Sequence, residues 1–233
     1  MRLTGVEYKR LVDKLIGITN EVYFLNQHAI LMPEDATIAA IMELENEVEE
    51  PCIIDLSELK RFKSLKRQLF IDFEFTKKGL VKLRTSEDRG RRLKITLPLL
   101  EIRETQDPEK IKSAMGEVKA SCYIERKLFE EIIKDACAWT ETDSVRLVLD
   151  EYSLVVKAEA SGGKAYEAYI EEIEEAQGKA NMKVKVDLLE RFKLWGDRVK
   201  LLFGNVFGVE LDAGKVLILI APIVDEEGGE NEE

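Results

Sequence analysis

Residues 93–101, Leu-Lys-Ile-Thr-Leu-Pro-Leu-Leu-Glu, decide the fold, because a similar stretch returns near the end of the chain. The second copy is residues 217–225, Leu-Ile-Leu-Ile-Ala-Pro-Ile-Val-Asp. Both copies have an apolar run, a proline (Pro98 and Pro222), two aliphatic residues and an acid. Proline suits the end of a β-strand, since it cannot donate to a continuing ladder. The recurrence predicts two similar halves joined by a connector.

The order of elements around these copies also recurs. Each half reads as a strand, a helix and several strands, and the predicted helices 55–65 and 187–195 share Asp-Leu at their start and Arg-Phe-Lys within. The sequence therefore predicts an α+β fold with two similar domains, in which helices cover one face of antiparallel sheets. The predicted boundaries are an N-terminal domain 1–101, a connector 102–119, a C-terminal domain 120–224 and an acidic tail 225–233.

Local patterns predict further elements of the first half. Apolar residues spaced at three and four positions predict a helix over 6–16. Residues 21–25 and 29–32 read as a hairpin with a turn at 26–28, and the acidic segment 45–50 reads as a loop.

Composition favours a soluble intracellular protein. The chain has 233 residues, 45% of them hydrophobic, and lacks an apolar run near the roughly 20 residues that span a membrane. Its three cysteines, Cys52, Cys122 and Cys137, are isolated, which is typical of reduced thiols. The formal net charge of −11 argues against a protein that coats DNA with its whole surface, but it permits a basic face.

The sequence offers no catalytic constellation. His28 is the single histidine, so neither a pair of histidine metal ligands nor a nucleophile–histidine pair away from it can form. The glycine turns at 162–164 and 204–208 lack the pattern of a phosphate-binding loop. The sequence therefore predicts a binding or scaffolding protein, not an enzyme, with no cofactor and no metal.

The predicted second helix is the most basic segment. Residues 55–67 carry five basic side chains against Asp55 and Glu58, a formal charge of +3. One interpretation is an ordinary solvated helix face. The other is a surface that binds phosphates without reading bases, formed where a duplicated architecture aligns its helices.

Four segments carry a resemblance to a known family. They are Val22-Tyr23-Phe24-Leu25, the run 29–39 (Ala-Ile-Leu-Met-Pro-Glu-Asp-Ala-Thr-Ile-Ala), Leu201-Leu202-Phe203-Gly204-Asn205, and 219–225. The chain resembles the sliding-clamp family of the proliferating cell nuclear antigen (PCNA) type. It departs from the family at His28-Ala29, where glycine is usual, and at Ile223, where a basic residue is usual. The departures suggest a divergent archaeal-type, viral or heteromeric clamp.

The resemblance implies a ring-shaped trimer, with helices lining a hole that encircles duplex DNA and edge strands pairing between subunits. The implied function is that of a DNA polymerase processivity factor, which recruits replication and repair proteins. The implied DNA-binding residues are Arg10, Lys14, Lys60, Arg61, Lys63, Arg67, Lys127, Lys134, Arg191 and Lys193.

The resemblance also implies a groove beneath the connector, where a polymerase, a clamp loader or another partner would dock a short peptide. Its residues would be Ile38, Ala39, Ile41, Ile111, Met115, Ala221, Pro222, Ile223 and Val224. For Ile38 and Ile41 a plain core position is an equal alternative.

Two further readings of the whole chain stay open. It could be a checkpoint-like or heteromeric clamp subunit, or a monomeric decoy that binds partners without encircling DNA. The expected location is the cytoplasm, at the nucleoid, for an archaeal or viral protein and the nucleus for a eukaryotic one, with no membrane partner.

Overall fold

A computed structural model describes the chain except for residues 77, 86–92, 103–105, 141, 161 and 225–233. The chain divides into two compact units. The first unit contains Met1–Ser113, Glu190–Leu194 and Asp212–Ile218. The second unit contains Ala114–Leu189, Trp195–Leu211 and Leu219–Glu233.

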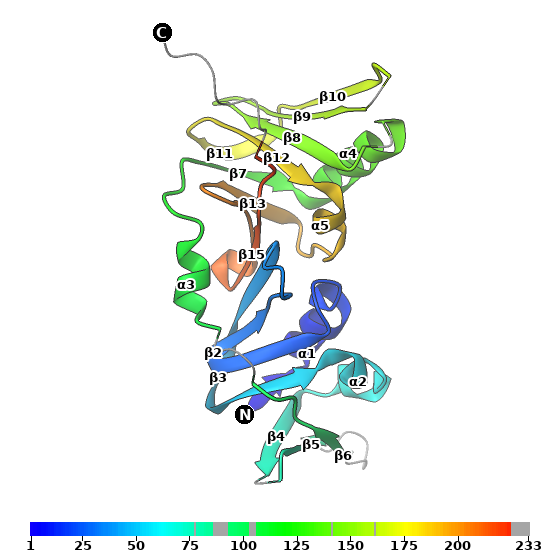
Figure 1. Cartoon of the computed structure of the whole chain (residues 1–233), viewed down its shortest axis with the longest axis vertical. Coiled ribbons are helices and arrows are strands. Elements are labelled where there is room, and N and C mark those ends of the chain that lie inside the picture. Colours follow the sequence, from blue (N-terminus) through cyan, green and yellow to red (C-terminus); the bar gives the residue numbers. More distant parts are fainter. Residues whose placement is uncertain (77, 86–92, 103–105, 141, 161, 225–233) are drawn as a thin grey trace. The chain divides into compact units, whose positions relative to one another are not determined.

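The first unit begins with a strand and a helix, followed by strands, short helices and strands (Figure 1). Its elements are β1 (Arg2–Thr4), α1 (Gly5–Lys9), the π-helix η1 (Arg10–Leu15), β2 (Glu21–Leu31), β3 (Ile38–Asp55), α2 (Leu56–Lys60), the 3-10 helix η2 (Lys63–Arg67), β4 (Phe70–Thr76), β5 (Leu80–Thr85), β6 (Lys94–Pro98), α3 (Pro108–Ser113) and the 3-10 turn η3 (Asp212–Gly214).

The second unit again starts with a strand and a helix. Its elements are β7 (Ala120–Glu125), α4 (Arg126–Thr140), β8 (Ser144–Leu149), β9 (Leu154–Glu159), β10 (Ala165–Ile170), β11 (Ile173–Gln177), β12 (Ala180–Lys185), α5 (Val186–Glu190), β13 (Arg198–Phe203), β14 (Phe207–Leu211) and the end of β15 (Val216–Ile220).

Strand order confirms the duplicated fold. In the first unit β1, β4, β5 and β6 form a sheet in that order, and β7, β13, β14 and β15 follow one another in the same way. The recurring stretches 93–101 and 217–225 thus supply strands at equivalent places, β6 after β5 and β15 after β14. Neighbouring strands run antiparallel, for example β4 with β5 and β13 with β14.

Each unit has its own apolar core. In the first, Phe24 and Phe73 lie with ring centroids 6.5 Å apart, and Tyr8, Leu11 and Leu15 of α1 and η1 are fully buried. In the second, Phe203 and Phe207 are 5.5 Å apart, and α4 packs on β9 and β10 (Figure 1). Among the described residues, no helix is long and apolar enough to cross a membrane.

Two predictions about the first half are wrong. The turn expected at 26–28 is part of β2, which continues past a β-bulge where Asn26 takes a φ of 51°. The loop expected at 45–50 is part of β3, where Val48 pairs with Asn26 of β2 and faces inward while the neighbouring glutamates face solvent. The register shifts on both sides of this pair take up the extra residues of β3 without ending the strand, so local turn residues mislead here.

The predicted helices occur at the expected positions, but they are not regular α-helices over their whole predicted lengths. Helix 6–16 is continuous as α1 and then η1. Helix 55–65 is interrupted, since Phe62 leaves helical geometry (φ −93°, ψ 77°) between α2 and η2. The helix expected at 187–195 is the shorter α5.

Candidate nucleic-acid interface

Hydrogen bonds fix the start of α1 and join it to α2. Thr4 and Glu7 form a capping box, in which the Thr4 amide donates to Glu7 Oε2 at 2.6 Å and the Glu7 amide donates to Thr4 Oγ1. Buried Glu7 also accepts from the Glu45 amide on β3 at 2.8 Å through Oε1. The Tyr8 hydroxyl donates to the carbonyl of Leu59 at 2.6 Å. The two helices are therefore held in one defined relation.

A distant segment of sequence completes this helical layer. Within the first unit the Lys193 amide donates to the carbonyl of Lys14 at 2.9 Å. Gly17 makes the approach possible, because a Cβ there would lie 2.0 Å from the Arg191 carbonyl oxygen. The layer therefore contains the first unit's predicted DNA-binding residues, which lie on η1, on the segment from α2 to η2 and on Glu190–Leu194.

Five of the first unit's predicted residues are exposed cations, namely Lys60, Arg61, Lys63, Arg67 and Lys193. Lys60, Lys63 and Arg67 have no acidic partner among the residues that the structure describes. The Asp55 carboxylate accepts a hydrogen bond from the Ser57 amide at 2.7 Å and so caps the start of α2. Lys60 is the last residue of this helix. Such unpaired cations suit phosphate oxygens.

A shallow pocket of about 370 Å³ lies between the end of η1 and α2. It is lined by Ile16, Gly17, Asn20, Ser57, Lys60 and Arg61. Two adjacent cations and two neutral polar side chains at one opening can hold an anionic group.

Other cations of this layer are already paired. Arg10 contacts Asp212 at 2.7 Å with both side chains about four-fifths buried, and Arg61 contacts Glu58 at 2.9 Å. Lys66, which the resemblance did not single out, pairs with Asp13 of η1. Exposed ion pairs such as Arg61–Glu58 stabilise little, so the Glu58 carboxylate chiefly reduces the positive charge available to a ligand.

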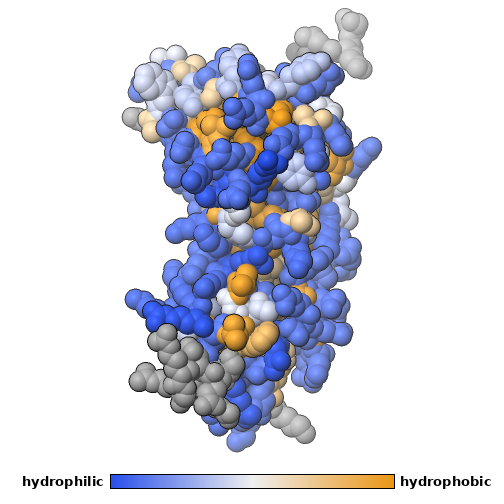
Figure 2. All heavy atoms as spheres, turned by 180° about the vertical axis from the view of Figure 1, so that it is seen from behind, coloured by the Kyte–Doolittle hydropathy of each residue, from blue (hydrophilic) through white to orange (hydrophobic). Residues whose placement is uncertain are grey.

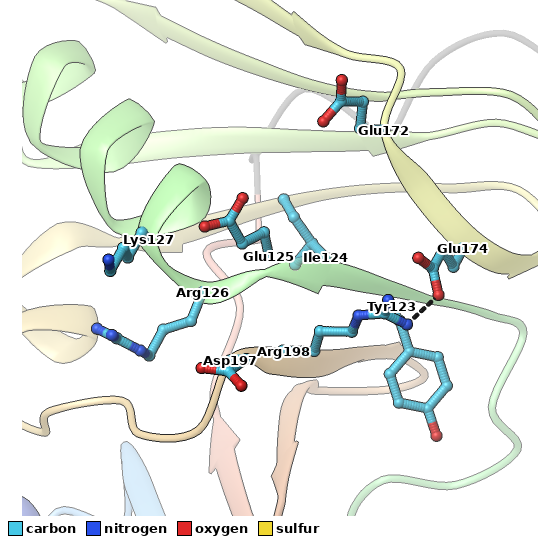
Figure 3. A pocket seen from close by; sticks show the side chains of 9 residues that line it. All are labelled: Tyr123, Ile124, Glu125, Arg126, Lys127, Glu172, Glu174, Asp197 and Arg198. Atoms are coloured by element: carbon cyan, nitrogen blue, oxygen red, sulfur yellow. Dashed lines mark hydrogen bonds and ion pairs between the residues drawn. The ribbon is translucent and has the colours of Figure 1, made fainter.

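In the second unit, the predicted residues Lys127 and Lys134 are both exposed on α4. Lys127 lines a pocket of about 350 Å³ beside the start of that helix (Figure 3). Opposite charges alternate around it: Arg198 pairs with Glu174, and Arg126 pairs with Glu130 at 2.7 Å and donates to the Gly196 carbonyl. Sequence reasoning missed this pocket, since its residues come from three separate segments, 123–127, 172–174 and 197–198.

The residues assigned to a partner groove lie in varied environments. Ile38, Ala39 and Ile41 of β3 are core residues, at most 5% exposed. Ile111 of α3 is half-buried against Tyr23, Ile30 and Ile53 of the first unit.

The remaining groove residues belong to the second unit. Met115 is buried, and its carbonyl accepts from the Asn205 amide at 2.7 Å. Ala221, Pro222 and Ile223 are half-buried, whereas Val224 is 82% exposed. Figure 2 shows a face that is mainly hydrophilic, with separate apolar areas on it.

His28, Cys52 and Cys122 are titratable groups outside the helical layer that are half-buried or buried. His28 is half-buried in β2, where burial and then Lys112 lower its pKa. Burial raises the pKa of the Cys52 and Cys122 thiols to about 12, so neither is a thiolate at neutral pH. Within the described part of the chain, no three His, Cys, Asp or Glu residues gather as metal ligands would.

Comparisons with known proteins identify the fold. No family model matches the sequence, and no curated protein matches it. The structure is similar to Archaeoglobus fulgidus PCNA bound to the C-terminal region of FEN-1, with a TM-score of 0.73 and 17% identity over 97% of this chain and 98% of that one.

It is also similar to PCNA from Thermococcus kodakaraensis, with the same TM-score of 0.73 and 17% identity, over 96% of this chain and 99% of that chain. The chain therefore has the fold of a PCNA sliding clamp along almost its whole length, as the resemblance implied.

Proposed function

We propose that this chain is a subunit of a DNA sliding clamp, a non-catalytic ring that encircles duplex DNA and serves as a processivity factor. The observation that carries the proposal is the helical layer of the first unit, on which Lys60, Lys63 and Arg67 are exposed and unpaired among the described residues. Unpaired lysine and arginine side chains bind phosphates without sequence preference, which permits sliding.

Ring formation is part of the proposal. β6 and β10 are the outermost strands of their four-stranded sheets, so each offers unpaired backbone groups. Pairing of β6 in one copy with β10 in the next would remove both edges. Heterologous contacts of this kind close into a ring when the rotation between copies permits.

Recruitment of replication and repair proteins is the second part. One of the similar structures holds the C-terminal region of FEN-1 on PCNA. We assign the equivalent role here to a short apolar peptide, docking on the partly exposed aliphatic side chains of the segment 221–224. Polymerases and clamp loaders are the expected partners.

Charge reversal tests the DNA-binding claim. The triple variant Lys60→Glu, Arg61→Glu and Lys63→Glu should bind DNA more weakly and with a weaker dependence on salt. The salt slope should become shallower by about 2–3, since each phosphate that is no longer neutralised removes about one unit. The measurement is retention on primed closed-circular DNA, with release after linearisation, together with stimulation of a polymerase.

The matched control is Lys164→Glu, Lys179→Glu and Lys185→Glu, which makes the same change in net charge on exposed residues of the second unit. Sedimentation checks that both variants assemble like the parent. Equal loss of binding in both variants, or none in the first, would refute the assigned surface. A stable monomer that still binds partner peptides would favour the decoy alternative.

A further inference from the structure

Two segments from the second half of the sequence complete the first unit. Lys215, which precedes β15, accepts a hydrogen bond from the Glu43 amide of β3 at 2.8 Å, and β15 lies beside β3 in the sheet. The segment Glu190–Leu194 contacts the end of η1, since the Lys193 amide donates to the Lys14 carbonyl at 2.9 Å. The start of β15 and this segment both belong to the first unit. Within one chain, β3 therefore has a strand partner and the end of η1 is covered.

Strand pairing identifies the equivalent part of the second unit. Residues 40–43 of β3 pair with 28–31 of β2, and residues 52–55 pair with 21–24. In the second unit β10 pairs with β9, and β12 pairs with β8. Because the order along the chain is the same in both units, β10 is the equivalent of residues 40–43. The repeated stretches likewise make β6 the equivalent of β15.

The second unit lacks both additions. β10 is the outermost strand of its sheet, so its outer edge has no strand partner among the described residues (Figure 1). Trp139 lies in the last turn of α4, the helix that packs on β10, and is 65% exposed. It precedes β8 by the same number of residues as Ile16 precedes β2, yet Ile16 is half-buried. An unpaired strand edge and a large exposed aromatic side chain in one unit indicate a surface that binds a partner.

The first half of the sequence holds the two segments that would supply these additions to another copy. Residues 58–62 are the equivalent of Glu190–Leu194, because Asp55 and Asp187 open the two matching stretches. β6 is the outermost strand of its own sheet. A pocket of about 200 Å³ lies where β6 meets the start of α2, and its lining is Ile54, Asp55, Glu58, Leu97, Pro98 and Leu100.

On the basis of the ring proposed above, we propose that Trp139 of one copy fills this pocket in the next copy, while β10 pairs with β6 beside it. The four apolar residues of the lining suit the indole ring, since an aromatic side chain buries about 150–250 Å². A buried indole N–H needs an acceptor, and the carboxylates of Asp55 and Glu58 supply one. Each copy has one such side chain and one such pocket, so the contact is head-to-tail, as a ring requires.

Sedimentation equilibrium of the full chain measures the strength of this contact. Trp139→Ser should weaken assembly about thirtyfold or more, as the loss of a buried aromatic anchor does. Trp139→Phe should restore most of the strength, because it keeps an aromatic ring. The matched control is Tyr152→Ser, which removes another exposed aromatic side chain of the second unit and should leave assembly unchanged.

Mixing two defective variants tests the head-to-tail geometry. Pro98→Glu places a third carboxylate at the pocket beside Asp55 and Glu58, so this variant should also fail to assemble alone. A mixture of Pro98→Glu with Trp139→Ser retains one intact pair of surfaces, the tryptophan of the first variant and the pocket of the second. The mixture should therefore form a dimer of about 53 kDa, twice the 26.6 kDa chain, and no larger species.

Fluorescence reports the burial of Trp139 directly. The chain has two tryptophans, so Trp195→Phe leaves Trp139 as the only one. Its emission should move to shorter wavelength, and its quenching by iodide should weaken, as the protein concentration rises through the range of assembly. The same measurement with Pro98→Glu added should show neither change.

The outcomes separate this contact from the ring itself. A parent protein that stays monomeric at every concentration refutes both. A parent trimer that is equally stable in Trp139→Ser refutes this contact alone, and so does an emission of Trp139 that does not change on assembly. If Trp139→Ser fails to fold, the fluorescence of Trp195→Phe decides.

Discussion

At the scale of single residues, acidic side chains decide which cations of the helical layer can reach a ligand. Arg10 and Lys66 are held by Asp212 and Asp13, whereas Lys60, Lys63 and Arg67 have no such partner among the described residues. The sequence predicted the basic character of 55–67, but not this selection. The paired acids lie 53 residues or more away from their cations, so no local count of charge could find them.

Removing one of these acids should strengthen DNA binding. Asp13→Asn frees Lys66 next to Lys63 and Arg67, so we expect affinity for duplex DNA to rise about threefold to tenfold at low salt. The salt slope should become steeper by about one unit, because one more phosphate is neutralised. Fluorescence anisotropy at several salt concentrations measures both quantities.

The matched control for this substitution is Glu151→Gln. It also converts a lysine-paired carboxylate to an amide, since Lys179 lies 3.5 Å from Glu151, but it lies in the turn between β8 and β9. An equal gain in both variants would mean that net charge alone sets the affinity. In that case the helical layer would have no special part in binding.

At the scale of elements, apolar periodicity found most helices and strands but could not find their interruptions. The spacing of Leu56, Leu59 and Leu65 suits one continuous helix, yet the chain leaves helical geometry at Phe62, and Leu65 is buried from η2 instead. Conversely, β2 continues through Asn26 because a bulge accepts its positive φ. Both outcomes depend on tertiary packing, which local pattern does not contain.

The contact between η1 and the segment Glu190–Leu194 depends on Gly17. A methyl group there would meet the Arg191 carbonyl oxygen at 2.0 Å, so Gly17→Ala should push the segment away and break the Lys193–Lys14 hydrogen bond. We expect a loss of about 2–3 kcal/mol in the free energy of unfolding, in the range of overpacked sites. Hydrogen exchange should show faster exchange confined to 190–194.

Gly79→Ala is the comparison for that variant. Gly79 has a positive φ of 70° and nothing within 4 Å of its would-be Cβ, so alanine there meets only a conformational cost of about 1–2 kcal/mol. Exchange at 190–194 should stay at the parent rate. Similar exchange in the two variants would show that the close approach of Arg191 is not what requires glycine.

At the scale of the whole molecule, the duplicated stretch predicted the fold because each copy fixes an equivalent strand. The order β1-β4-β5-β6 is matched by β7-β13-β14-β15, and structures 17% identical in sequence share the architecture over almost the entire chain. The pattern of strand ends and helix starts is therefore retained while most side chains change. A local motif, by contrast, could not reveal the second unit's pocket, whose lining comes from three segments.

Assembly decides whether these elements work as a clamp, and the edge strand β10 allows a direct test. Tyr169 lies on that edge, 66% exposed, with its hydroxyl donating to Glu167 at 2.9 Å. A large exposed aromatic side chain at an edge is suited to contact a neighbouring copy.

Sedimentation equilibrium should give the parent a mass of about 80 kDa, three times the 26.6 kDa chain. Tyr169→Ser should weaken the trimer about tenfold or more, a loss of roughly 1.4 kcal/mol. Tyr152→Ser removes a tyrosine that is 79% exposed in the turn before β9, and it should leave the mass unchanged. A parent protein that remains at 26.6 kDa at every concentration would exclude a homomeric ring, because β6 and β10 would then stay unpaired.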